Sequence, residues 1–85
     1  MPIISQFFGI MISMFWADHN PPHFHARYGE YEVVVEIKTG KVNGKFPVRA
    51  LGLVQEWRVL HARDLMEDWD LAGKREMLRA IDPLE

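Results

Sequence analysis

The sequence predicts an α+β fold, with a three- to four-stranded antiparallel sheet followed by two helices packed on one face. Residues 31–38 alternate between apolar and polar side chains, which is typical of a half-buried antiparallel strand. The Gly29-Glu30 pair just before them predicts a tight hairpin turn. Residues 48–72 carry apolar side chains at spacings of three and four, which is typical of helix. The 85 residues are predicted to form a single small α+β domain, residues 1–85.

The remaining strands are predicted from shorter patterns. Residues 1–6 are expected to be a lead-in without regular structure. Residues 8–16 are apolar on both faces, which favours a central strand covered on both sides. Residues 18–22 contain two prolines and predict a turn, and residues 23–28 predict the strand that follows it. Residues 41–46 are expected to form a short edge strand.

The helical pattern is too long for one helix in so small a domain. A helix over residues 48–72 would measure about 37 Å at 1.5 Å per residue. We therefore expect a break near residues 62–64, with Asp64 capping the second helix and Gly73 ending it. Residues 74–85 form a basic and then apolar tail that either docks on the domain or meets a partner.

Composition excludes several classes of protein. Hydrophobic residues make up 48% of the chain and aromatic residues 12%, so the sequence can build a core. There is no cysteine, which excludes disulfides and thiolate zinc sites. The formal net charge of −2 does not predict nucleic-acid binding by electrostatics alone.

The N-terminal sixteen residues carry no charged side chain, yet they match neither a signal peptide nor a membrane span. A signal peptide would have a basic start and a small-residue cleavage site, and Asp18 interrupts the apolar run before the roughly 20 residues that a span needs. We expect a cytoplasmic protein without a membrane partner. Apolar side chains in the lead-in and the tail favour a homo-oligomer.

Three of the four histidines lie within residues 19–25, and this cluster is the candidate site. Strand alternation places two of them on one face with an arginine, while Tyr28 points to the other face. The candidate catalytic residues are His23, His25, His19, Asp18 and Arg27.

Three interpretations of the cluster remain open. Two imidazoles and an arginine suit metal-independent cleavage of RNA, in which one ring takes the 2′-hydroxyl proton and the other protonates the leaving oxygen. Histidines two apart on a strand also suit a metal, with His19 or Asp18 as third ligand. The third interpretation is structural, with the side chains hydrogen-bonding the proline turn. No cofactor is predicted, and metal binding is left open.

Other conspicuous residues have simpler interpretations. His61 lies on the apolar helical stripe, where a hydrogen-bonded core histidine is the commoner case. Trp57 and Trp69 are expected in the core. The acidic residues at positions 67, 68 and 70 are expected on a solvated face.

The string Asp18-His19-x-Pro21-Pro22-His23-x-His25 resembles a small bacterial family catalogued as domain of unknown function 4160. The resemblance extends over nearly the whole chain, through Phe8-Gly9-Ile10, Tyr28-Gly29-Glu30-Tyr31, Arg49-Ala50-Leu51, Glu56-Trp57, His61, Trp69 and Ile81-x-Pro83-Leu84.

The resemblance implies a partner rather than a chemistry. Members of that family are often encoded beside a second small family, in an arrangement similar to toxin–antitoxin pairs, and some carry a transcriptional-regulator label. We therefore expect one component of a two-protein toxin–antitoxin-like module, with a small partner protein encoded next to it. The sharper expectation is a toxin that acts on RNA through the histidines; the alternative is a non-catalytic binding or transcriptional-regulator subunit.

Overall fold

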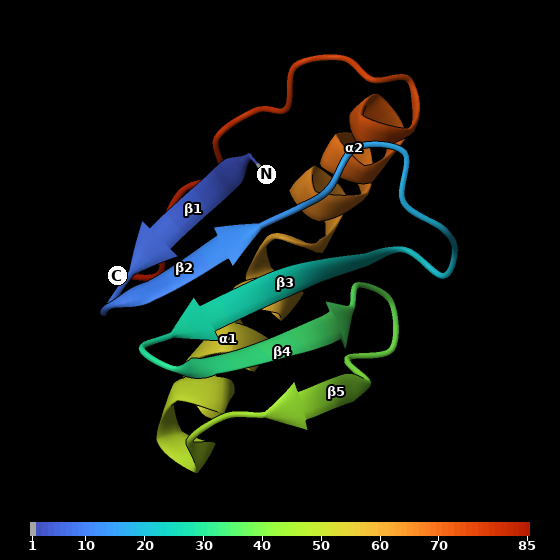
Figure 1. Cartoon of the computed structure of the whole chain (residues 1–85). Helices are drawn as coiled ribbons and strands as arrows, with labels where there is room; N and C mark the ends of the chain where they lie inside the picture. Colours follow the sequence, from blue (N-terminus) through green and yellow to red (C-terminus); the bar gives the residue numbers. More distant parts are fainter. Residues whose placement is uncertain (1) are drawn as a thin grey trace.

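Five antiparallel strands form one sheet within residues 2–85, the part of the chain that the computed structural model describes. The strands lie in chain order across the sheet: β1 (Ile3–Phe7), β2 (Ile10–Ser13), β3 (His23–Tyr28), β4 (Tyr31–Glu36) and β5 (Val42–Lys45). They are followed by α1 (Val48–Leu60) and α2 (Ala62–Gly73), which cover one face and lie behind the sheet in Figure 1. The predicted α+β class is confirmed, whereas the predicted number of strands was too low.

The additional strand is β1, in the segment that the sequence predicted to be a lead-in. Met1 lies outside the described residues. Phe8 and Gly9 reverse the chain with φ angles of 48° and 79°, and two successive left-handed residues are typical of a type I′ hairpin turn. The predicted strand over residues 8–16 is therefore shorter, because it begins only at Ile10 and ends at Ser13. It is also not covered on both sides, because both helices pack on the same face of the sheet.

The β3–β4 hairpin forms as predicted. Its two-residue turn pairs Tyr28 with Tyr31, and the register continues through His25 opposite Val34. The expected edge strand is β5, which pairs with β4 only. These pairs fix which side chains of neighbouring strands lie side by side.

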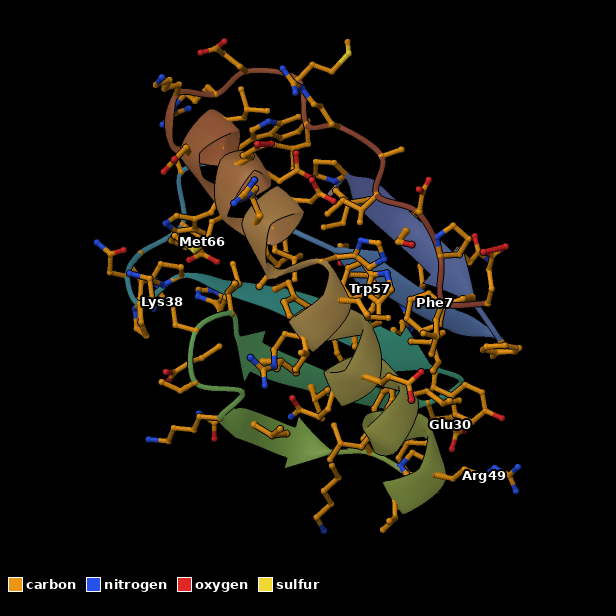
Figure 2. The ribbon with its side chains drawn as sticks, turned by 180° about the vertical axis from the view of Figure 1, so that it is seen from behind. Phe7, Glu30, Lys38, Arg49, Trp57 and Met66 are labelled. Carbon is orange, nitrogen blue, oxygen red and sulfur yellow. The ribbon has the colours of Figure 1, made fainter. Side chains whose placement is uncertain are left out.

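The core lies between the sheet and the helices. The fully buried Trp57 of α1 is at its centre, with its ring centroid 5.5 Å from that of Phe7 and 5.7 Å from that of Phe24. Figure 2 shows Trp57 beside Phe7, between α1 and the sheet. Trp69 is partly buried against this core, so both tryptophans pack as predicted.

The helical region breaks one residue earlier than predicted. His61 has φ −118° and ψ 25°, which separates α1 from α2. Asp64 lies inside the first turn of α2 and is not its cap; its carboxylate is 3.5 Å from Nδ1 of His61. The His61 ring also contacts Trp57 but is only half-buried, so the expected core position is met in part.

The C-terminal tail docks against β1 and the helices. The backbone N–H of Ile81 donates to the carbonyl of Ile4, and Nε1–H of Trp57 donates to the carbonyl of Asp82. The backbone N–H of Arg79 donates to Oδ1 of Asp68, whose residue is 1% exposed. The expected solvated position of Asp68 was therefore wrong, because the tail covers it.

This docking buries much of the apolar surface that favoured an oligomer. The buried members are Ile4, Phe7, Ile81 and Leu84, while Ile3, Phe8 and Met77 remain exposed. A homo-oligomer stays a prediction. Within residues 2–85, no helix is both long and apolar enough to cross a membrane.

Candidate functional site

The connection between β2 and β3 holds the candidate site at one end of the sheet. It passes over the end of α2, where the N–H of Ala17 donates to the carbonyl of Ala72 at 2.9 Å. Nε1–H of Trp16 donates to the carbonyl of Glu76, also at 2.9 Å. Ala17 has φ 54°, a left-handed conformation that an alanine adopts only when its surroundings hold it. The connection thereby directs Asp18 toward β3.

His23 is buried, and both of its ring nitrogens face oxygen atoms. Nδ1 lies 2.7 Å from the carbonyl oxygen of Pro21, and Nε2 lies 2.8 Å from Oδ2 of Asp18. A neutral imidazole carries one N–H, so both contacts are hydrogen bonds only when each nitrogen bears a proton. The alternative is that Nδ1–H donates to Pro21 and a cation lies between Nε2 and the carboxylate.

Asp18 is oriented by its contacts with His19 and His23. Its Oδ1 accepts from the backbone N–H of His19 at 2.8 Å and lies 2.9 Å from the ring Nδ1 of that residue. Burial raises the pKa of Asp18, but the hydrogen bonds from His19 and His23 outweigh burial and lower it overall. The carboxyl group is therefore ionised at neutral pH.

His25 is the unusual member of the cluster. Within residues 2–85, neither of its ring nitrogens has a hydrogen-bond partner, although both are buried. Nδ1 lies 3.9 Å from Oε2 of Glu32, which is too long for a hydrogen bond. Phe15 packs edge-on against the ring, with centroids 4.6 Å apart. Burial, together with the nearby His23, lowers the pKa of His25, so its ring is neutral at physiological pH.

The cluster borders a pocket of about 550 Å³. The pairing of His25 with Val34, and of Val34 with Asn43, shows that this pocket lies on the sheet face that the helices leave uncovered. Its lining residues are Phe15, Trp16, Ala17, Asp18, His19, Pro21, His23, His25, Val34, Glu36, Lys41 and Asn43. The pocket therefore combines ionisable groups with exposed aromatic rings at positions 15 and 16.

The structure brings four of the five predicted site residues together and places the fifth apart. Asp18, His19, His23 and His25 line the 550 Å³ pocket. Arg27 lies farther along β3, beside a smaller pocket of about 90 Å³ that also contacts His25. Arg27 is therefore not positioned against the Asp18–His23 pair.

Sequence reasoning did not identify Val34, Glu36, Lys41 and Asn43 as part of the site. The predicted Gly29-Glu30 turn contained part of the missing information. A two-residue hairpin fixes the pairing of its strands, so it places Val34 opposite His25 and Glu36 opposite His23. Lys41 and Asn43 depend on the β4–β5 register, which the pattern of residues 41–46 indicates only weakly.

Comparisons with known proteins give a family. Neither the curated proteins nor the solved structures yield a match to this chain. The family model described as "Domain of unknown function (DUF4160)" matches residues 9–70, which include the whole Asp18–His25 cluster and most of the sheet and helices. Since the match covers well over half of the 85 residues, the chain belongs to the DUF4160 family.

Proposed function

We propose that this chain is one component of a bacterial toxin–antitoxin-like two-protein module, and that it is the toxin, acting on RNA through the Asp18–His25 site. A small protein encoded next to it would be the partner. The family resemblance supports the existence of a partner. The pocket on the uncovered sheet face supports the role in RNA recognition.

The observation that carries the proposal is the combination of groups around this pocket. Phe15 and Trp16 are 40% and 47% exposed at its border, close to the ionisable groups of the cluster. Single-stranded RNA is commonly recognised by stacking its bases on exposed aromatic rings, often on a sheet surface. Lys41 supplies a positive charge for a phosphate in the same pocket.

The chemistry expected of the site is the cleavage of a phosphodiester bond. The 2′-hydroxyl of a bound ribose would lose its proton to a base in the cluster and attack the phosphorus, which forms a 2′,3′-cyclic phosphate as the bond to the 5′-oxygen breaks. The leaving 5′-oxygen would then gain a proton from an acid in the cluster. The side chain of His19 is 88% exposed, so its ring is available as a proton donor or acceptor at the pocket border. The rings of His23 and His25 are deeper and would orient the reacting groups.

Growth and RNA integrity test the proposal together. The chain is expressed alone and with its genomic neighbour, and total RNA is examined at intervals. We expect growth arrest and RNA fragmentation with the chain alone, and rescue by the neighbour. A folded His23/His25 double alanine variant should lose the toxicity. Intact RNA during growth arrest, or toxicity that persists in this variant, would exclude the proposed site.

The alternative function is a non-catalytic binding or transcriptional-regulator subunit that works through its partner. The state of His23 favours it, since a buried histidine with contacts to Pro21 and Asp18 at both nitrogens resembles a structural residue. On this alternative, co-expression gives a complex that protects or represses a target, and the chain alone neither slows growth nor degrades RNA.

A further inference from the structure

We propose that Asp18, His23 and His25 bind a divalent transition-metal ion such as Zn²⁺, with one carboxylate oxygen and two imidazole nitrogens as ligands. Metal binding by the isolated chain does not require the proposed activity toward RNA, so the two proposals can fail separately. Four observations on these residues support it.

The first observation is the convergence of the ligand atoms. One atom from each of the three residues can be chosen so that all lie within 4.8 Å of one another. Around a tetrahedral zinc, ligand atoms about 2.1 Å from the metal are about 3.4 Å from one another. Oδ2 of Asp18 and Nε2 of His23 are 2.8 Å apart, so an ion between them requires a shift of less than an ångström.

The second observation is the outer contact of His23. A metal-bound histidine usually donates its other N–H to a carbonyl or carboxylate, which fixes the tautomer and the ring orientation. Here Nδ1 lies 2.7 Å from the Pro21 carbonyl oxygen, which leaves Nε2 as the ligand atom. When Nε2 carries no proton, its lone pair faces that of the Asp18 carboxylate, and a cation between the two accounts for this contact.

The third observation is the outer contact of Asp18. Oδ1 accepts the backbone N–H of His19, which holds the carboxylate with its other oxygen toward His23. The ligating carboxylates of metal sites are hydrogen-bonded in the same way. Asp18 thus has one oxygen held by the protein and one directed into the cluster.

The fourth observation is the unpaired ring of His25. Across the described residues 2–85, its two nitrogens are buried without any hydrogen-bond partner, which costs free energy unless something binds them. Its ring centroid lies 5.6 Å from that of His23. A metal ion held by Asp18 and His23 gives one of these nitrogens a partner.

The site would also leave room for a substrate. Three protein ligands with an open fourth position are typical of catalytic zinc, and the 550 Å³ pocket adjoins the cluster. The pocket also contains two carboxylates, Asp18 and Glu36, against the single cation Lys41. A divalent ion would offset this negative charge for a phosphate, a consequence that rests on the proposed function.

Calorimetric titration tests the site directly. The chain is first treated with a chelator, then dialysed and titrated with Zn²⁺; Co²⁺ is added in parallel to observe its visible absorption. We expect one ion per chain and a tetrahedral Co²⁺ spectrum. Asp18→Asn, His23→Ala and His25→Ala should each weaken binding on the order of a hundredfold or more. His61→Ala removes a histidine away from the cluster and should bind like the unaltered chain.

A measurement on the unaltered chain guards against variants that fail to fold. Proton–nitrogen spectra of the imidazoles should change for His23 and His25 when Zn²⁺ is added, while those of His61 stay unchanged. Absence of stoichiometric binding, or changes at His61 in place of the cluster, would overturn the proposal. Zinc binding without RNA cleavage would refute the proposed activity alone, and cleavage by a chain that binds no zinc would refute the metal site alone.

Discussion

Replacing His25 by phenylalanine should stabilise the metal-free protein, although His25 is a candidate site residue. Its two ring nitrogens are buried and unpaired in residues 2–85, and each unsatisfied polar group costs about 1–3 kcal/mol. A phenyl ring removes both and keeps the edge-on contact with Phe15. The added volume opposes this gain by about 1–3 kcal/mol if the surroundings do not yield. The pocket beside the ring reduces that strain.

With that strain near its lower bound of about 1 kcal/mol, and a gain of about 2–6 kcal/mol from removing two unsatisfied groups, the expected net result is a rise of about 1–5 kcal/mol in the free energy of unfolding. For a domain of this size it corresponds to a midpoint of thermal unfolding higher by roughly 4–8 °C per kcal/mol. Urea denaturation in the presence of a chelator measures the free energy, and a thermal scan measures the midpoint. The chelator matters because bound Zn²⁺ at 100 times its Kd would stabilise the unaltered chain by about 2.7 kcal/mol.

His23→Phe is the matched control, since it makes the same substitution two residues away. It removes the ring contacts with Pro21 and Asp18 and leaves their oxygens without that partner, so we expect a loss of about 1–3 kcal/mol. The two variants should therefore change stability in opposite directions. If His25→Phe destabilises the chelated protein as much as His23→Phe does, the His25 ring is paired in solution and the reasoning fails.

Three further predictions concern the rest of the fold. Burial raises the pKa of Asp68, so the folded state holds the carboxyl proton more tightly, and the free energy of unfolding should fall as pH rises above the ordinary aspartate pKa of 3.8. Asp68→Asn should lack this fall when urea denaturation is measured at a series of pH values. If the free energies of the variant and the unaltered chain depend on pH in the same way, the prediction is wrong. Gly44→Ala should lower the free energy of unfolding in urea by about 1–3 kcal/mol, because the alanine Cβ would lie 2.6 Å from the carbonyl oxygen of Glu32 in the neighbouring strand. Unchanged stability would show that β5 moves to make room for it. Trp57→Phe removes the N–H that binds the Asp82 carbonyl, and should speed hydrogen exchange and proteolysis of the tail; unchanged rates would show that other contacts hold it.

The hairpin and the helices were predictable because their signals are local. Alternation over residues 31–38 and the Gly29-Glu30 turn specify β3, β4 and their register together. β1 was missed because its turn has phenylalanine at the first left-handed position, where glycine, asparagine or aspartate is usual. Gly9 was the one recognisable sign of that turn, and the sequence pattern around it favoured a strand start.

The site was predictable in its members and not in its contacts. Strand alternation correctly placed His23 and His25 on the face opposite Tyr28. The pairing of Asp18 with His23 depends on the path of the β2–β3 connection over α2, through the contact of Ala17 with Ala72. Contacts between residues far apart in the sequence leave no local pattern, and the burial of Asp68 by the tail was missed for the same reason.

Features that oppose folding gather at this end of the sheet. Ala17 has a left-handed backbone, and both ring nitrogens of His25 are buried with no hydrogen-bond partner in the described residues 2–85. Such features persist only where the surroundings hold them, and they concentrate at functional sites. Asp68 also has an unpaired buried oxygen, but burial raises the pKa of this carboxyl group, and a proton taken up there removes the buried charge. A neutral imidazole already carries its proton, so His25 gains most from a ligand that accepts its lone pair, and an ion beside His23 and Asp18 would provide one.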